Sequence, residues 1–472
     1  MTSGAWVFGL GLALALGVMP ACAQEVVRKQ YDDGSIYEGT FKDGRQDGTG
    51  TYQLPNGFEY TGDWVAGEIK GKGKAIYPNG SFYVGTFAKG KPDGTGKMTF
   101  SDGSTYEGDW IAGAMTGEGE STYANGASYK GSFVAGKQDG QGVMTDPDGT
   151  IYDGAWVGGV KEGQGKMTYA DGTLYQGSFK AGMPEGAGKL AMPDGVVYDG
   201  NWVGGQINGQ GTLTQANGDT YAGAFANGQR VGKGKLTYAN GDVYEGVFAA
   251  DERNGQGIFT ATDGARYSGL WVAGHMQGAG AMTYADGSVF VGTFQADEPN
   301  GLGKITYADG STYEGHWVSG EILGLGKAVY ANGQSYQGQF AAGKPDGMGR
   351  MTQTDGFVYE GQWKAGLRQG EGRATYADGS VYTGHFTQGL RDGVGRLSTQ
   401  TGFSYVRYWK ARAIEGHDIT TFTGGAVHHG QFVTGEGEGQ GKLTYAPDQI
   451  SEGFWHKGVL IAPKSLNPGN GR

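Results

Sequence analysis

Cysteine is almost absent from this 472-residue chain, in which Cys22 is the only one. Cys22 lies within an apolar amino-terminal segment of the kind that directs secretion, so the chain left after cleavage would hold no thiol. Disulfide bonds and cysteine-ligated metal sites are therefore excluded for the mature protein. A bacterial lipoprotein would carry its lipid on a cysteine at this place, but Met19-Pro20-Ala21 matches the usual preceding residues poorly. Lipid anchoring is therefore the less favoured alternative.

Charged residues are missing from the first 23 positions, including the basic region that often opens a signal peptide. Residues 5–18 are apolar, and Ala21 and Ala23 match the small residues of a signal-peptidase site. We predict a signal peptide over residues 1–23, cleavage near Ala23, and a periplasmic or secreted mature protein. The alternative is a retained membrane anchor, but roughly 14 apolar residues are too few to span a bilayer comfortably.

Basic residues are also in the minority, with 37 Lys and Arg against 48 Asp and Glu, which gives a formal net charge of -11. The predicted signal peptide is uncharged, so all of this charge lies on the mature chain. No long run of Lys and Arg offsets it. Nucleic acid is therefore excluded as the expected partner.

Apolar residues make up only 37% of the chain, whereas glycine contributes 97 residues and the aromatic residues are 28 Tyr, 20 Phe and 10 Trp. A chain of this composition cannot fill the several ordinary cores that its length would require. Because so much glycine seldom accompanies so many aromatic residues, the composition favours a repeat protein.

A 23-residue repeat explains this composition. An aromatic residue recurs every 23 positions, a glycine usually follows two residues later, and Phe or Trp follows four residues later. Every tryptophan except Trp6 occupies this fourth place. The recurring first residues are Tyr37, Tyr60, Tyr83, Tyr106, Tyr129, Tyr152, Tyr175, Tyr198, Tyr221, Tyr244, Tyr267, Phe290, Tyr313, Tyr336, Tyr359, Tyr382 and Tyr405.

Each repeat should fold as a β-hairpin. A Gly-x-Gly follows the Phe or Trp, and Asp-Gly or Asn-Gly usually precedes the next Tyr, which is a strong signal for a tight turn. Apolar residues alternate with period two and never with the period of a helix. The sequence therefore predicts an all-β protein with two short antiparallel strands per repeat and almost no helix.

Strand parity separates an aromatic face from a polar face, because side chains alternate between the two sides of a strand. The pattern predicts that Tyr152 lies opposite Met167, Gly154 opposite Gly165, and Trp156 opposite Gly163. The same register should continue into neighbouring repeats. Each large ring would then lie over glycine, where it buries apolar area at roughly 25 cal/mol per Å² without a second layer of structure.

The motifs resemble the MORN repeat. One unit reads Tyr-Glu-Gly-Asp-Trp at 106–110, Gly-x-Gly at 117–119 and Asn-Gly at 125–126, and the likeness runs without a gap over residues 37–398. The resemblance implies an elongated, single-layer, twisted antiparallel sheet of stacked hairpins. It also implies a role in scaffolding, dimerisation or attachment near membranes, and it does not by itself imply catalysis.

The ends of the array depart from the repeat. Residues 24–36 supply only the second strand and turn of a unit, so we expect a half-repeat that begins the sheet. Residues 399–462 keep the 23-residue phase but lose several of its glycines, as expected of degenerate terminal repeats. We expect residues 463–472 to be a disordered tail.

Residues with catalytic or metal-binding potential do not form convincing sites, so we expect no enzyme activity, no cofactor and no metal ion. The run at 435–442 resembles a phosphate-binding loop, but Leu443 stands where Ser or Thr should follow. Only His417, His428 and His429 could gather around a metal, and surface or capping histidines are the favoured interpretation.

Acidic residues on the polar face should form weak surface ion pairs with bases of the second strands. The acids in this interpretation are Glu107, Asp153, Glu314 and Glu360, and the bases are Lys166, Lys304 and Lys327.

We predict a non-catalytic scaffold or interaction protein of the cell envelope that presents its repeated surface to a protein partner. Contact with a membrane or a glycan and formation of a homodimer are further options, although the negative charge predicts weak binding to anionic phospholipid. The alternative is a ligand-binding module that stacks sugars or acyl chains on the aromatic ladder. Its candidate binding face comprises Trp64, Trp110, Trp156, Trp202, Trp271, Trp317 and Trp363. The favoured interpretation of the aromatic rings, however, is that they form the core, because a one-layer sheet has no other apolar material to bury.

Overall fold

The computed structural model describes residues 25–402, 404–410, 413–422, 424–433, 436–446 and 449–463. Throughout this part of the chain the only regular element is the β-strand, which confirms the predicted all-β class. The predicted signal peptide and all but the first residue of the predicted tail lie outside the described residues. The chain divides into two units, Met1–Ile207 and Asn208–Arg472, which are described separately.

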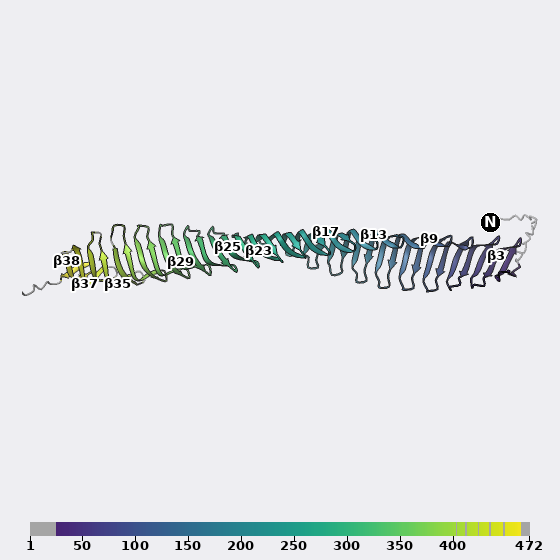
Figure 1. Ribbon diagram of the computed structural model, residues 1–472, viewed down its shortest axis with the longest axis horizontal. Coiled ribbons are helices and arrows are strands. Elements are labelled where there is room, and N and C mark those ends of the chain that lie inside the picture. The colour runs from purple at the N-terminus through teal and green to yellow at the C-terminus, as the bar shows by residue number, and fades with distance from the viewer. Residues whose placement is uncertain are drawn as a thin grey trace, which may run out of the picture. The chain divides into compact units, whose positions relative to one another are not determined.

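Unit 1 is an open antiparallel sheet in which each strand lies beside its neighbours in the sequence (Figure 1). It begins with β1, which pairs with β2. Its strands are β1 (Val27–Gln30), β2 (Ile36–Lys42), β3 (Arg45–Gln53), β4 (Glu59–Val65), β5 (Glu68–Ile76), β6 (Phe82–Ala88), β7 (Lys91–Thr99), β8 (Thr105–Ile111), β9 (Ala114–Thr122), β10 (Ser128–Val134), β11 (Lys137–Thr145), β12 (Ile151–Val157), β13 (Val160–Thr168), β14 (Leu174–Lys180), β15 (Met183–Ala191) and β16 (Val197–Val203).

Unit 2 repeats this arrangement as a second series of stacked antiparallel hairpins. Its first strand, β17, begins two residues before the boundary. Its strands are β17 (Gln206–Thr214), β18 (Thr220–Ala226), β19 (Gln229–Thr237), β20 (Val243–Ala249), β21 (Glu252–Thr260), β22 (Arg266–Val272), β23 (His275–Thr283), β24 (Val289–Gln295), β25 (Glu298–Thr306), β26 (Thr312–Val318), β27 (Glu321–Val329), β28 (Ser335–Ala341), β29 (Lys344–Thr352), β30 (Val358–Lys364), β31 (Leu367–Thr375), β32 (Val381–Thr387), β33 (Leu390–Ser398), β34 (Ser404–Lys410), β35 (Ala413–Thr421), β36 (Val427–Val433), β37 (Glu436–Ala446), β38 (Gln449–His456) and β39 (Val459–Pro463).

Two-residue loops close the hairpins. Between β4 and β5 the loop residues Ala66 and Gly67 both have positive φ angles, 50° and 90°, as a type I′ turn requires. In the loop after β20 the glycine is replaced by Asp251, which has a φ of 70°. Its carboxylate accepts a hydrogen bond from the backbone N–H of Arg230 at 2.9 Å, and this contact compensates for the strained backbone.

The strand register agrees with the prediction at two of three places. Tyr152 lies opposite Met167 and Gly154 opposite Gly165, as expected. Trp156, however, lies opposite Lys161 and not Gly163. The seven-residue strand β12 faces the nine-residue strand β13, so the hairpin absorbs the extra length in a bulge between Gly154 and Trp156. The glycine that faces the tryptophan belongs instead to the preceding strand, β11.

The recurring tyrosines form the centre of the core. Tyr152 is 1% exposed, and its ring lies over the two glycines of the paired strands. A Cβ atom on Gly154 or Gly165 would lie 2.6 or 2.5 Å from the Tyr152 hydroxyl oxygen. That hydroxyl donates a hydrogen bond to the backbone carbonyl of Ala155 at 2.9 Å. The predicted packing of rings over glycine is therefore present, and tyrosine is the residue that does it.

Candidate interaction surfaces

The seven tryptophans predicted as a binding face are buried. Their exposed fractions range from 3% for Trp271 to 7% for Trp202. In each, the indole N–H donates a hydrogen bond to a glycine carbonyl fourteen residues earlier, as from Trp156 to Gly142 at 3.1 Å. The same bond recurs at Trp64, Trp110, Trp202, Trp271, Trp317 and Trp363. In each unit these residues are therefore part of the core.

Edge-to-face contacts explain how a single sheet buries such large rings. Trp64 packs against Tyr37 of the preceding repeat and Tyr60 of its own repeat, with ring centroids 5.1 and 5.7 Å apart. The interplanar angles are 80° and 78°, a geometry that aromatic pairs favour. The residue opposite Trp64 in its hairpin is Ile69. A sugar or acyl chain therefore finds no open tryptophan face at this site.

Arginines cover the rings in some repeats of unit 2. The guanidinium carbon of Arg253 lies 4.2 Å from the centroid of the Trp271 ring, and Arg230 lies within 5.6 Å of the Tyr221 and Phe248 centroids. Both arginines stand nine residues after the repeat's first tyrosine. The repeat pattern does not reveal this covering position, because several residue types occupy it, including Ile69 in unit 1.

Burial also sets the protonation state of the core tyrosines. Desolvation raises the pKa of Tyr336 from 10.0 to about 12, and it raises the pKa of Tyr152 to about 12. A tyrosine of ordinary pKa is already protonated at neutral pH, and the raised pKa keeps these hydroxyls protonated in more alkaline solution, where they still donate hydrogen bonds to backbone carbonyls. These phenols serve the fold, since an acid–base catalyst needs a pKa near the working pH.

Ion pairs cross the polar face between neighbouring strands. Glu107 pairs with Lys97 at 3.1 Å, and Glu360 pairs with Arg350 at 2.8 Å. All four side chains are more than half exposed, so each pair contributes under about 1 kcal/mol. The other two predicted acids lie opposite predicted bases in the register: Asp153 lies opposite Lys166, and Glu314 lies opposite both Lys304 and Lys327.

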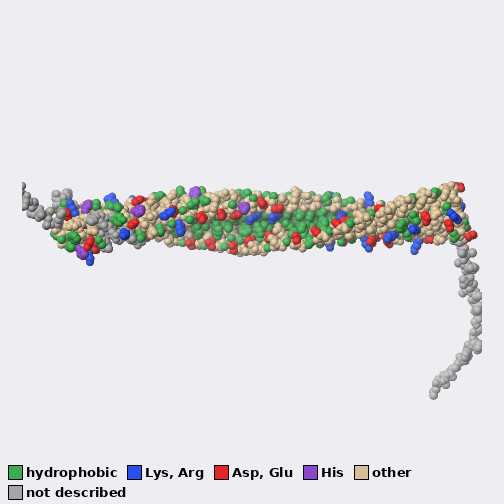
Figure 2. All heavy atoms as spheres, turned by 90° about the horizontal axis from the view of Figure 1, so that it is seen from below, with side chains coloured by type: hydrophobic (Ala, Val, Ile, Leu, Met, Phe, Trp, Pro, Cys, Tyr) green, Lys and Arg blue, Asp and Glu red, His purple; other side chains and the backbone are tan. Residues whose placement is uncertain are grey.

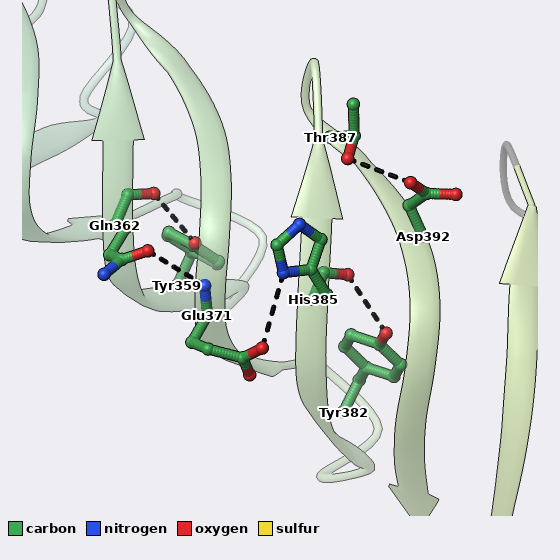
Figure 3. A network of polar contacts seen from close by, with 7 residues as sticks. All are labelled: Tyr359, Gln362, Glu371, Tyr382, His385, Thr387 and Asp392. Atoms are coloured by element: carbon green, nitrogen blue, oxygen red, sulfur yellow. Dashed lines mark hydrogen bonds and ion pairs between the residues drawn. The ribbon is translucent and has the colours of Figure 1, made fainter.

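The histidines lie in different environments. His385 on β32 points toward Glu371 on β31, with 3.3 Å between its Nδ1 and the carboxylate (Figure 3). His428 occupies the place of the repeat's first tyrosine and is buried against Trp455, at 4.9 Å between ring centroids. His429 follows directly and so faces the other side of the strand. The His417 side chain lies outside the described residues, and the described residues contain no group of His, Cys, Asp or Glu that could hold a metal.

The aromatic face of unit 1 contains an open groove near its first strands. This groove of about 590 Å³ is lined by the half-buried rings of Tyr31, Tyr52 and Phe58, together with Trp64 and Ile69. Figure 2 shows that hydrophobic side chains also gather elsewhere on the face in view, away from the amino-terminal strands. Apolar surface thus remains beside the buried ladder.

The polar face of unit 2 carries an exposed apolar row that the sequence analysis did not identify. Leu302, Leu325 and Met348 are the middle residues of three successive Gly-x-Gly motifs, and their exposed fractions are 63, 62 and 58%. A groove of about 810 Å³ includes the two leucines in its lining. The signal was present in the sequence, because earlier repeats carry polar residues such as Thr95 and Gln141 at this place.

Comparison with known families agrees with the repeat described above. The model described as MORN repeat matches most of the chain, including one segment within the region predicted to be degenerate. The matched segments are residues 37–58, 60–82, 83–105, 106–128, 129–151, 152–174, 175–197, 198–220, 221–243, 244–266, 267–289, 290–312, 313–335, 336–358, 359–381, 382–402 and 428–448.

Comparison with individual proteins adds little. No curated protein matches the chain. The similar solved structures include the SAS-4 (dCPAP) TCP domain of Drosophila melanogaster with a proline-rich motif of Ana2, at 19% identity and a TM-score of 0.23, covering 33% of this chain and 87% of that one. The TCP10 domain of Danio rerio CPAP in complex with a STIL peptide is 14% identical with a TM-score of 0.15, covering 57% of this chain and 93% of that one. Scores this low carry no argument about fold or function.

A search for membrane-spanning helices within the described residues finds none that is long and apolar enough.

Proposed function

This chain belongs to the MORN repeat family, and from that premise we propose that it is a non-catalytic scaffold or interaction protein of the cell envelope. Its sheet binds a protein or membrane partner. The observation that carries the proposal is that the two faces of the sheet use their apolar side chains differently. The large rings are used in the core, whereas apolar residues such as Leu302 and Leu325 are exposed on the opposite face.

The chemistry of the polar face supports binding over catalysis. Glu107 and Glu360 are solvated and paired with bases, whereas a general acid usually needs a desolvated carboxyl group. The core tyrosines hold their protons well above neutral pH. Repetition of shallow surfaces is better suited to a long partner than to a small substrate.

A second candidate function is binding of a sugar ring or acyl chain, for which the groove lined by Tyr31, Tyr52 and Phe58 is the favoured place. Its volume of about 590 Å³ lies in the range of small-molecule sites, and half-buried rings can stack on a sugar. Tyr52→Ala should abolish binding to immobilised glycans without affecting capture of the protein partner. If glycan binding is absent from the parent chain, this candidate fails.

An affinity experiment tests the leading proposal. The full chain with a carboxy-terminal tag is produced with its own signal, recovered from the envelope fraction, and used to capture proteins and lipids from envelope extract. We expect a protein to be retained that an empty matrix does not retain, and we expect the recovered chain to begin at Gln24. Recovery of the chain in the cytoplasm with residues 1–23 intact, or capture of no protein or lipid, would contradict the proposal.

A further inference from the structure

Three successive repeats expose large apolar side chains on the polar face, and we name Leu302, Leu325 and Met348 the apolar strip. Each lies on the second strand of its hairpin, on β25, β27 and β29. The corresponding residues in unit 1 are Thr49, Lys72, Thr95, Glu118, Gln141, Gln164 and Ala187. Only Ala187 in that series is apolar, and it is small.

The fold does not need the apolar strip. Leu325 lies across from Gln339 of the next strand, and Met348 lies across from Gln362, so the residues directly across from them are polar. Both residues are more than half exposed and lie on the face opposite the aromatic core. Apolar side chains kept in water at three consecutive repeats are characteristic of a binding surface.

Bases accompany the apolar strip at the same spacing. Lys304, Lys327 and Arg350 each follow a member of the strip by two residues, so they point to the same face. We call them the basic row. Its line across the strands continues through Arg373 and Arg396, and the five bases along it alternate with only two acids, Glu314 and Glu360. Bases therefore outnumber acids by three along this line, although the chain as a whole has a net charge of -11.

The spacing of the strip matches the repeat of a polyproline II helix. Leu302 and Leu325 are two strands apart, which is about 9.6 Å at about 4.8 Å per strand. A polyproline II helix advances about 9.3 Å in its three-residue turn and presents every third side chain on one side. In an extended β-strand, residues that lie three apart in the sequence face opposite sides. A strand could therefore not place every third side chain on three successive members of the apolar strip.

From this match we infer that the apolar strip and the basic row bind an acidic polypeptide segment in the polyproline II conformation, laid across strands β25–β29. The ligand carries an apolar side chain at every third residue for the strip and carboxylates for the basic row. Charge complementarity favours this occupant over a neutral peptide. The inference rests on the proposed interaction function and names the chemistry of its partner.

A defined peptide tests the inference. The probe is a fluorescein-labelled peptide of five Leu-Pro-Glu triplets, titrated with the full chain and followed by fluorescence anisotropy. We expect saturable binding that weakens as salt is raised, because exposed charges are screened. Peptides in which Ser replaces every Leu, or Lys replaces every Glu, should bind at least about tenfold more weakly.

Variants of the chain locate the binding site. The double change Leu302→Gln and Leu325→Gln installs a residue that other repeats already carry at this position, so the fold is preserved. It should weaken binding about tenfold for each leucine removed. The matched control changes Ile111 and Val157, which are exposed to a similar extent elsewhere, to Gln and should leave binding unchanged. Lys304→Glu with Lys327→Glu should weaken binding at low salt and have little effect at high salt.

Several results would overturn the inference. Equal binding of the peptide by the parent and the double glutamine variant would place the site elsewhere. Preference for an amphipathic helical peptide, dependence of vesicle flotation on the strip, or loss of a dimer in sedimentation when the strip is changed would each assign the strip to another occupant. If the parent and the double glutamine variant capture the same partner from envelope extract equally well, the apolar strip is not its binding site, whereas the proposed function stands. Failure to capture any partner would count against the proposed function itself.

Discussion

Replacing Gly154 with valine tests whether the core depends on tyrosine rings that lie directly over glycine. A Cβ atom at this position would lie 2.6 Å from the Gly165 Cα and 2.6 Å from the Tyr152 hydroxyl oxygen. Non-bonded carbon atoms normally approach to about 3.5–4.0 Å. The ring or the neighbouring strand must therefore move.

The expected loss of stability in Gly154→Val has two sources. Overpacking of a tight core costs about 1–3 kcal/mol. Displacement of Tyr152 also breaks the 2.9 Å hydrogen bond from its hydroxyl to the Ala155 carbonyl, at about 1 kcal/mol. The β-branched side chain of valine favours strands and offsets a part of this. We expect a net loss of about 1–3 kcal/mol in the local stability of the β12–β13 hairpin.

Hydrogen exchange read by mass spectrometry is the suitable assay, because a repeat array can open locally without unfolding as a whole. Peptides from residues 151–168 should exchange faster in Gly154→Val, whereas those from distant repeats should be unaffected. The control is Gly424→Ala, since a Cβ at Gly424 would meet no atom within 4 Å. Unchanged exchange in residues 151–168 would refute the packing of rings over glycine as a source of stability.

Three other predictions concern the hydroxyl, the loop and pH. Tyr313→Phe should lower the free energy of unfolding by only about 1 kcal/mol, because it removes the 3.1 Å hydrogen bond to the His316 carbonyl but keeps the ring, and Phe290 already occupies the equivalent buried position. In urea unfolding, a loss of stability as large as that of Tyr313→Leu would contradict this. Asp251→Asn should be milder than Asp251→Ala by about 1 kcal/mol, since asparagine can still accept the hydrogen bond from Arg230 and tolerates a positive φ; equal melting temperatures would count against that contact. The raised pKa of the core tyrosines contributes stability that is fully present below about pH 10 and is lost as the pH rises through about 12. Circular dichroism should therefore show alkaline unfolding in this window. An unchanged spectrum above pH 12 would refute this contribution to stability.

Local patterns in the sequence predict most of the fold, because each repeat contains its own turn residues and strand alternation. The pairing of Tyr152 with Met167 follows from parity alone. The position of Trp156 could not be predicted in the same way, because the bulge depends on how a two-residue loop joins strands of unequal length. Parity places a ring on a face, but it does not say what covers the ring. The composition favours the rings as core, and the positions of Tyr37, Tyr60 and Ile69 around Trp64 show which residues cover the tryptophan.

The apolar strip was missed for a different reason. Searching for what recurs draws attention to the residues that every hairpin needs, whereas Leu302 and Leu325 occupy a place where the repeat imposes no constraint. Variation at such a position carries information about binding that the repeated residues do not carry. A comparison of each repeat with its neighbours, position by position, would have detected it.

The contacts between Trp64 and Tyr37 have a mechanical consequence. Hydrogen bonds between strands run along the direction in which the hairpins stack, and the tryptophan N–H bond to Gly50 joins one repeat to the previous one. A force that separates the two ends of a unit would load these bonds a few at a time, as in unzipping, and not all together as in shear. Each repeat released would lengthen the chain by about 70 Å, which is 23 residues at about 3.4 Å less the roughly 9.6 Å that the hairpin occupied. Such a sheet would yield in even steps at modest force, and it would recover its length hairpin by hairpin when the load is removed.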